Sequence, residues 1–347
     1  MKGSAVIIGA GIAGLAAGRA LVAEGWDVAI HERLSGLSTA GTALGIWPDT
    51  YRALEELGVT EFLNETITTF SHFEIRNPEG RVLARPRVPG NLRGLRRKDL
   101  LAGLYAGLPN GTVVFDSAVA ELHELPAADV VVVADGVHSA ARKAVFPAAR
   151  LRDLGTYALR GTLDFTPNSQ SETWGRGRLF GFGGYAGGGT NWYAGLRSEL
   201  AEVNGGGNLA LLKEKYRGWH AGVLEVIDHI TEDGIDRRHL EDLAPLRSYV
   251  SGKYVLVGDA AHAMAPNLGR GGCEALVDGL ALAKALTAGR GVEEALSRYD
   301  AERRRPTQRI VAGSRLMNNI AAAENYLPVR TAALAMLGVA FRGSSED

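Results

Sequence analysis

Apolar positions along the chain form two different patterns. The segments SAVII, ADVVVV and KYVLV are nearly unbroken apolar runs, which are typical of parallel strands covered on both faces. From about residue 156 to residue 196 the apolar positions instead alternate with polar ones and are interrupted by glycines and aromatic residues. Alternation of this kind favours an antiparallel sheet. We therefore expect a parallel α/β layer that the chain leaves for an antiparallel sheet and re-enters near residue 253.

Helical periodicity and turn signals add elements around these strands. Helices are expected at about residues 50–57, 98–108 and 209–217, and the chain is expected to end in helices. A hairpin is predicted where two alternating runs flank the turn NPEG at 77–80. The basic run AERRRPTQR, which includes Arg303, is expected to be a solvated helix face interrupted by Pro306.

The first apolar run leads directly into a glycine-rich turn and then into a helix. Gly9, Gly11 and Gly14 have the spacing G-x-G-x-x-G. The first glycine allows a tight turn, the second allows a pyrophosphate to approach the main chain, and the third allows the helix to pack closely on the strand. Glu32 ends the second strand, where a carboxylate can accept hydrogen bonds from an adenosine ribose. The segment therefore predicts a dinucleotide site, and the acid favours FAD or NAD over NADP without choosing between the first two.

A second glycine cluster lies far along the chain. An apolar strand ends at Gly258-Asp259, small residues follow as far as Pro266, and a helix then opens through more glycines. These are Gly269, Gly271 and Gly272. Glycines ahead of a helix leave room for a ligand close to the main chain. Because the chain re-enters the first sheet here, both glycine turns can reach the same ligand.

Composition narrows the classes of function. The 347 residues suit one large domain or two interlocked ones, and the formal charge of −1 argues against a nucleic acid partner. Cys273 is the only cysteine, which excludes an internal disulfide and a cysteine-based zinc site and fits a reducing cytoplasm. The apolar stretches 5–23 and 328–341 are too interrupted or too short to predict an export signal or a membrane span. We expect no metal site, and both a monomer and a homodimer remain open.

Three separated stretches together resemble a known family. They are the GAGIAG turn with Glu32-Arg33, the stretch VVVVADGVHSAARKAVF with its pattern D-G-x-x-S-x-x-R, and the stretch GDAAHAMAP at 258–266. In this order and at these separations they resemble the single-component (group A) FAD-dependent monooxygenases, the family of para-hydroxybenzoate hydroxylase. The resemblance covers nearly the whole chain.

The resemblance implies an α/β fold in which a three-layer, Rossmann-like FAD-binding domain of the glutathione reductase type is interleaved with an antiparallel substrate-binding sheet. The expected boundaries are 1–70, 97–155 and 251–290 for the FAD-binding domain, 71–96 and 156–250 for the substrate-binding domain, and 291–347 for C-terminal helices. FAD is long, so its adenosine half would lie on the first turn and its flavin half at the second glycine cluster. The helix that begins there would stabilise negative charge on the reduced ring.

The resemblance also implies roles for individual residues. Arg97 and Asp259 would bind the phosphate and ribityl groups, and Asp135 and Arg142 would serve both FAD and NAD(P)H. The full set of expected cofactor contacts is Gly9, Gly11, Ala13, Gly14, Glu32, Arg33, Arg97, Asp135, Arg142, Asp259, Gly269, Gly271 and Gly272.

Pro266 and Arg270 are the residues expected nearest the flavin. Where the family commonly has G-Q-G-x-N, this chain reads GRGGC from Gly269. Arg270 either lies near the flavin or an acidic group of the substrate, or points to solvent. His262 is expected to shape the backbone, and Cys273 is more consistent with packing than with redox chemistry.

The implied reaction is a hydroxylation. NADH or NADPH would reduce FAD, O₂ would add to the flavin C4a atom, and the hydroperoxide would oxygenate a small electron-rich aromatic such as a phenol, quinoline, indole or polyketide-like ring. The candidate substrate contacts on the antiparallel sheet are Arg160, Trp192, Tyr193 and Arg197. Alternation does not show which of them face the site, and each also fits a purely structural or surface position. An epoxidase, oxidase or dehydrogenase of the same fold, or a flavoprotein that only binds a small aromatic, remains an alternative.

Overall fold

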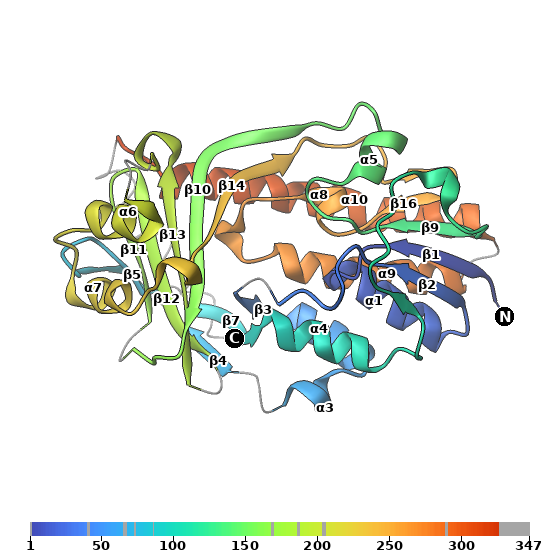
Figure 1. Cartoon of the computed structure of the whole chain (residues 1–347), viewed down its shortest axis with the longest axis horizontal. Coiled ribbons are helices and arrows are strands. Elements are labelled where there is room, and N and C mark those ends of the chain that lie inside the picture. The colour runs from blue at the N-terminus through green and yellow to red at the C-terminus, as the bar shows by residue number, and fades with distance from the viewer. Residues whose placement is uncertain are drawn as a thin grey trace, which may run out of the picture.

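The computed structural model describes residues 2–325 apart from 40–41, 65–67, 73, 86, 168–169, 186–187, 203–205 and 289–290. The apolar stretch 328–341 lies outside the described residues. Among the residues that are described, no helix is both long and apolar enough to cross a bilayer. The chain forms two main sheets that lie side by side, joined by long elements that run from one to the other (Figure 1).

The first main sheet has six strands in the order β15-β16-β9-β1-β2-β8. The strands are β1 (Ser4–Ile8), β2 (Asp27–His31), β8 (Val113–Val114), β9 (Val130–Val133), β15 (Val250–Ser251) and β16 (Tyr254–Leu256). Every neighbouring pair is parallel except β15 with β16. All four valines of β9 are buried, as expected for an apolar run covered on both faces. The predicted parallel layer is therefore confirmed.

Helices pack around this sheet. They are α1 (Ile12–Ala23), α2 (Pro48–Glu56), α3 (Thr60–Leu63), α4 (Arg97–Ala106), α5 (Ala140–Val145), α8 (Asp259–His262) and α9 (Gly271–Ala288), with short 3₁₀ turns η1 (Leu122–Glu124) and η4 (Pro266–Leu268). The helices expected at 50–57 and 98–108 correspond to α2 and α4. Helices α1 and α9 approach so closely that Gly279 lies against the backbone of Ala16 and Ala17.

The second main sheet has seven strands in the order β14-β10-β13-β12-β11-β5-β6. The strands are β5 (Glu74–Arg76), β6 (Val82–Ala84), β10 (Leu151–Leu163), β11 (Ser171–Trp174), β12 (Arg178–Tyr185), β13 (Gly189–Arg197) and β14 (Asp236–Leu243). Its neighbouring pairs are antiparallel except β11 with β5. The predicted hairpin is β5–β6.

Two helices cover the outer face of this sheet (Figure 1). Helix α6 (Gly207–Lys215) was expected, whereas α7 (Ala221–Asp228) was not. Short 3₁₀ turns, η2 (Ser198–Leu200) and η3 (Glu232–Gly234), flank them. Leu159, Phe180 and Trp192 pack against α6 and α7 in a separate apolar core. The outer face is therefore closed, and the inner face is the one turned to the first sheet.

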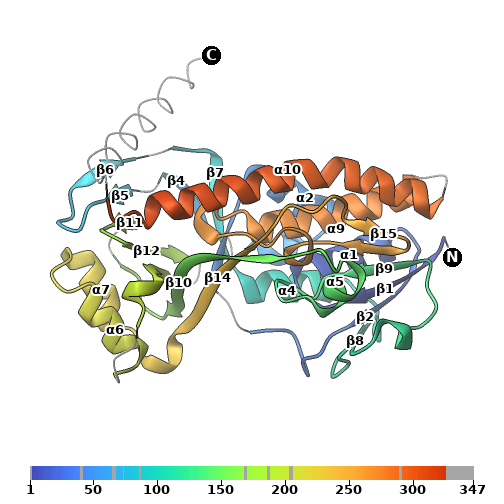
Figure 2. The same cartoon turned by 90° about the horizontal axis from the view of Figure 1, so that it is seen from above.

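A small sheet and one long helix connect the two parts. The small sheet has the order β3-β7-β4, formed by β3 (Ala43–Ile46), β4 (Thr68–His72) and β7 (Arg87–Arg96). Helix α10 (Val292–Ala321) packs on α9 and extends to the seven-stranded sheet, where Ala321 is buried beside Ile75 and Trp174 (Figure 2). Pro306 lies inside this helix, so the interruption predicted there was wrong.

The late return of the chain to the first sheet brings three turns together. β16 pairs in parallel with β9, which in turn pairs with β1. Val257 N–H donates to the Val133 carbonyl at 3.1 Å, and Ala134 N–H donates to the Ile8 carbonyl at 2.9 Å. Parallel strands end at the same edge of a sheet, so the turns after Ile8, Val133 and Leu256 meet there.

The crossing of α1 and α9 predicts a strict size limit at Gly279. A Cβ atom there would lie 2.5 Å from the Ala17 nitrogen, so Gly279→Ala must force the helices apart. Overpacking should lower the free energy of unfolding by about 1–3 kcal/mol or more. This loss exceeds the roughly 1 kcal/mol by which alanine stabilises a helix relative to glycine. Urea unfolding measures it. The matched control is Gly313→Ala in α10, whose nearest neighbour would be Leu268 Cδ1 at 3.4 Å and which should unfold at an equal or higher midpoint.

Candidate functional site

The glycines of the first turn fall into two kinds. Gly9 and Gly14 are required by the packing of the protein itself, whereas Gly11 leaves space that only a ligand would fill. Gly9 has φ +102°, and a Cβ atom there would lie 2.6 Å from the Ala134 carbonyl oxygen. A Cβ atom at Gly14 would overlap the Gly9 carbonyl oxygen. At Gly11, in contrast, a Cβ atom would meet nothing within 4 Å. Since no side chain caps the N-terminus of α1, Gly11 leaves a main-chain surface open beside free N–H groups.

Glu32 is fixed beside this turn by two backbone donors. Its carboxylate accepts hydrogen bonds from Ala10 N–H at 2.8 Å and from Leu34 N–H at 3.0 Å. Arg33 next to it is exposed. The acid at the end of β2 is therefore oriented before a ligand arrives, with acceptor capacity left for ribose hydroxyls.

The second turn begins at Gly258, which has φ +59° and would place a Cβ atom 2.9 Å from that of Ala13. Asp259 follows as the exposed first residue of α8. Arg97 lies within electrostatic range of both turns. Burial lowers the pKa of Arg97 and so does the charge of Arg160, whereas Asp259 and Glu32 raise it. The expectation that Arg97 contacts phosphate or ribityl groups stays a prediction.

The turn after β9 contains Asp135 and Arg142, and the structure separates their roles. Asp135 Oδ1 is buried with no hydrogen-bond partner among the described residues, which leaves an acceptor for a ligand hydroxyl or N–H. Arg142 is 1% exposed and donates to the carbonyl oxygens of Val137 at 2.6 Å and Ala260 at 3.1 Å. The Arg142 guanidinium thus connects the turn after β9 to the turn at Gly258 from inside the protein, and its expected role with FAD and NAD(P)H stays a prediction.

Pro266 and the second glycine cluster shape the start of α9. Pro266 begins η4, and α9 starts two residues after Gly269. Nothing lies within 4 Å of a Cβ atom at Gly269, whereas one at Gly272 would touch Leu44 at 3.3 Å. The expected position of the flavin ring at this helix start stays a prediction.

Arg270 is neutralised by two acids. It donates to Asp49 at 2.7 Å and to Glu274, and its guanidinium lies 5.5 Å from the centre of the Trp47 ring. Burial acts to lower the pKa of Arg270, but the two acids raise it overall. Arg270 is therefore paired within the protein rather than turned freely to solvent, and its expected place near the flavin or an acidic substrate group stays a prediction.

Glu274 also belongs to a buried chain of charged side chains. Arg303 on α10 bridges Glu274 at 2.6 Å and Asp278 at 2.7 Å, and it is only 8% exposed. Asp278 in turn accepts from His262 Nε2 at 2.6 Å and from Gly258 N–H at 2.8 Å. The expectation that Arg303 lies on a solvated face was therefore wrong. The sequence did contain a signal for these ion pairs. Glu274 and Asp278 interrupt an otherwise apolar helix segment, and a buried acid requires a partner.

His262 and Asp278 shift each other's protonation. Burial acts to lower the pKa of His262, but the charge and hydrogen bond of Asp278 raise it above its ordinary value of 6.5. Burial acts to raise the pKa of Asp278, but His262 and Arg303 lower it. The second turn is thus held by a charged pair rather than by backbone shape alone.

The inner face of the seven-stranded sheet is the one on which substrate contacts were expected. Asn191 Oδ1 on this face accepts a hydrogen bond from Ala43 N–H of β3 at 3.0 Å. Tyr193, two residues further along β13, shares this face and lies directly opposite Arg160 of β10. Trp192 points the other way, is fully buried and is stacked on Phe180, so the expectation that it contacts a substrate was wrong.

Two further residues complete this face. Arg197, at the end of β13, pairs with Glu199 at 3.3 Å. Glu172 of β11 accepts hydrogen bonds from Tyr193 and from Trp174 Nε1. Glu172 was missed from the sequence, although its alternation with Trp174 on a short strand places both on one face.

These features define the class of protein. A parallel sheet whose three strand-end turns meet at one edge, two widely separated glycine turns, an oriented acid and an unsatisfied buried acceptor make a binding site for an elongated dinucleotide.

Comparison with known proteins identifies the family. The sequence matches the family described as FAD binding domain at residues 2–89 and 237–314. It is 29% identical to the aurachin C monooxygenase/isomerase of Stigmatella aurantiaca, over 92% of this chain and 90% of that one. It is 30% identical to the 3-amino-4-hydroxybenzoate 2-monooxygenase of Streptomyces cremeus, over 86% and 82%. In fold it is similar to Klebsiella pneumoniae HpxO complexed with FAD and uric acid, with a TM-score of 0.86, 22% identity and coverage of 98% and 95%.

The chain belongs to the group A FAD-dependent aromatic monooxygenases. It is an FAD-dependent monooxygenase, and FAD is its cofactor.

Gly11 allows FAD binding to be separated from folding. Because a side chain at Gly11 meets no protein atom, Gly11→Val should unfold at nearly the same urea concentration as the wild type. It should nevertheless weaken FAD binding by about 100-fold or more, since the side chain takes the place of the pyrophosphate. FAD fluorescence on titration of the apoprotein measures this. Equal affinity in the two proteins would contradict the assignment of this turn.

The His262–Asp278 pair predicts a pH dependence of stability. A histidine whose pKa is raised in the folded state contributes stability that is fully present below about pH 6.5 and is lost as the pH rises through the folded-state value. The difference in unfolding free energy between wild type and His262→Gln should therefore shrink as the pH rises from about 6.5 to about 9. Urea unfolding over this range measures it, with exposed His123→Gln as the control. A difference that is constant or grows would show that His262 is not charged in the fold.

Proposed function

We propose that this monooxygenase takes its electrons from NADH or NADPH and hydroxylates a small electron-rich aromatic compound held between FAD and the inner face of the seven-stranded sheet. The observation that carries the proposal is the position of that face. Asn191 joins it to β3, and Arg160 acts electrostatically on Arg97. A substrate on this face would lie beside the second glycine turn.

The chain's own residues would bind and orient the cofactor. Glu32 would hold the adenosine ribose, and the open main chain at Gly11 would accept the pyrophosphate at the start of α1. Arg97 and Asp259 would hold the middle of the molecule, and Asp135 Oδ1 would accept a hydrogen bond from it. When bound, FAD supplies the hydride acceptor and the site of oxygen activation.

The start of α9 would contribute electrostatics. Its first N–H groups carry partial positive charge and stabilise an anion that lies against them. Arg270 cannot add its full charge there, because Asp49 and Glu274 neutralise it. The sheet above the ring would exclude water, which limits the unproductive loss of reducing equivalents.

The names of the relatives support an aromatic ring as the substrate. One is named for 3-amino-4-hydroxybenzoate, another for urate and a third for a 2-heptyl-3-hydroxy-4(1H)-quinolone. The compounds in these names differ in charge and size, which is consistent with a common cofactor site and a variable sheet face.

The proposal predicts incorporation of one oxygen atom from O₂. A panel of phenols, hydroxyquinolines and indoles should contain compounds that accelerate NADH or NADPH consumption by the FAD-loaded protein, and the product formed under ¹⁸O₂ should gain one labelled oxygen by mass spectrometry. Gly11→Val serves as the control that lacks the cofactor. Accelerated consumption with only hydrogen peroxide as product, or an oxidised product without label, would replace the hydroxylase with an oxidase or dehydrogenase of the same fold.

A further inference from the structure

The inner face of the seven-stranded sheet carries a continuous row of side chains. Residues that lie directly opposite each other on neighbouring strands share a face. One such row runs across six strands from β5 to β14. Its members are Ile75, Glu172, Gly181, Tyr193, Arg160 and Asp236.

Tyr193 lies flat along this row. A Cβ atom at Gly181 would overlap the Tyr193 ring, so the ring covers the position where a side chain of β12 would stand. The Tyr193 hydroxyl donates to Glu172 on the next strand but one, and Tyr193 is still 36% exposed. The glycine and the acid together hold an aromatic ring against the sheet with part of its surface uncovered.

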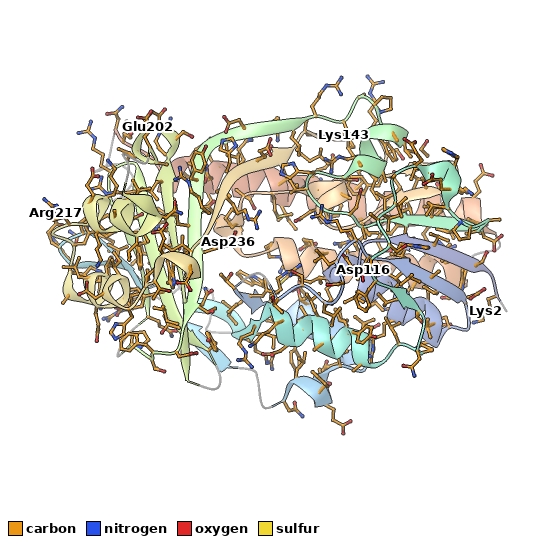
Figure 3. All side chains as sticks on the ribbon, viewed as in Figure 1. Lys2, Asp116, Lys143, Glu202, Arg217 and Asp236 are labelled. Carbon is orange, nitrogen blue, oxygen red and sulfur yellow. The ribbon has the colours of Figure 1, made fainter. Side chains whose placement is uncertain are left out.

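The charged side chains of the row differ in their partners, since Arg160 has an acid beside it and Glu172 has only neutral donors. Arg160 forms an ion pair with Asp236 at 3.0 Å. Asp236 lies on β14, the edge strand of the sheet, and is labelled in Figure 3. Both hydrogen-bond donors to Glu172, the Tyr193 hydroxyl and the Trp174 indole, are neutral groups. Burial raises the pKa of Glu172, against the effect of these two hydrogen bonds, and burial together with the charge of Glu172 raises the pKa of Tyr193 well above its ordinary value. Tyr193 thus keeps its proton, and Glu172 is an acceptor whose two described donors carry no charge.

We propose that Tyr193 is the surface on which the substrate ring stacks and that Glu172 is a positioning residue that selects uncharged aromatic substrates with a hydrogen-bond donor over aromatic carboxylates. The proposal rests on the proposed function and narrows its substrate class. A phenol O–H or a ring N–H can donate to the free lone pairs of Glu172 or of the Tyr193 oxygen. A substrate carboxylate would instead bring a second acid beside Glu172 in a place of low dielectric, where two acids do not both ionise, so its binding costs either like-charge repulsion or the uptake of a proton.

Stacking accounts for the glycine at position 181 of the row. Aromatic pairs gain most when their faces are offset and accessible, which requires a ring that lies flat. Any side chain at Gly181 would tilt the Tyr193 ring away from the sheet. Gly183, on the same strand and face, is less restrictive, since a Cβ atom there would only touch Gln170 at 3.4 Å.

The test is equilibrium binding to the FAD-loaded protein, read from the change in the flavin absorption spectrum. The probes are 4-hydroxyquinoline, its 2-carboxylate and its 2-carboxamide, and in parallel 4-methylphenol with 4-hydroxybenzoate. We expect the uncharged compounds to bind about tenfold or more tightly than the matched carboxylates. The carboxamide, which has nearly the size of the carboxylate, should bind like the parent quinoline and so separates charge from bulk.

Variants assign the effect to the two residues. Glu172→Gln keeps the shape of the side chain and removes its charge, so the preference for uncharged probes should fall to about threefold or less. Gly181→Ala should weaken binding of every probe by about tenfold or more while FAD affinity is retained, whereas the control Gly183→Ala should change it by no more than about twofold. Should Gly181→Ala not fold, Tyr193→Ala removes the ring and is expected to give the same loss.

Three results would overturn the inference. They are equal or tighter binding of the carboxylates to the wild type, an unchanged preference in Glu172→Gln, and equal binding by Gly181→Ala and Gly183→Ala. Failure of every probe to bind the FAD-loaded protein would overturn it as well. These readouts require no turnover, so they are distinct from the absence of labelled oxygen in the product, which would count against hydroxylation itself.

Discussion

The buried carboxylate of Asp278 is the interaction on which the cofactor site depends most. It accepts hydrogen bonds from the backbone of the second glycine turn, from His262 and from Arg303, and so connects α8, α9 and α10. Charged groups taken out of water are stable only when each has a partner, and here each has one or two. Removing Asp278 would leave His262 without its acid and Arg303 with Glu274 alone, which explains how three helices and a tight turn come to occupy one fixed arrangement.

The two halves of the site are built from different materials. The cofactor half consists mainly of glycines, main-chain N–H groups and a few acids at strand ends, whereas the proposed substrate half consists of side chains on one face of a sheet. Main-chain recognition requires particular backbone conformations, which only certain residues permit, as Gly9 and Gly258 show. Side-chain recognition changes with single substitutions. The same fold can therefore keep one cofactor while its substrates vary.

This difference also explains what the sequence could predict. The spacing of Gly9, Gly11 and Gly14, the acid at Glu32 and the apolar runs are local signals, and they sufficed for a dinucleotide site, the two kinds of sheet and the late return of the chain. The choice of FAD came from the resemblance carried by three separated stretches. Arg303 was misjudged because its partners Glu274 and Asp278 lie on another helix, and the pairing of Arg270 with Asp49 was not foreseen for the same reason, since charge alone does not reveal a partner. Alternation placed Trp192 and Tyr193 on opposite faces, but the covered face became known only with α7 in place.

The pairing of β16 with β9 has a consequence for how the protein is made. During synthesis from the N-terminus, the apolar strand Val130–Val133 can pair with β1 early, but its other edge stays open until Tyr254–Leu256 has been added. At roughly 5–20 residues per second on the ribosome, that interval lasts many seconds, during which most of the seven-stranded sheet emerges. An open apolar strand edge is a template for aggregation. The edge of β9 in a nascent chain is thus exposed to other chains until the last strand arrives.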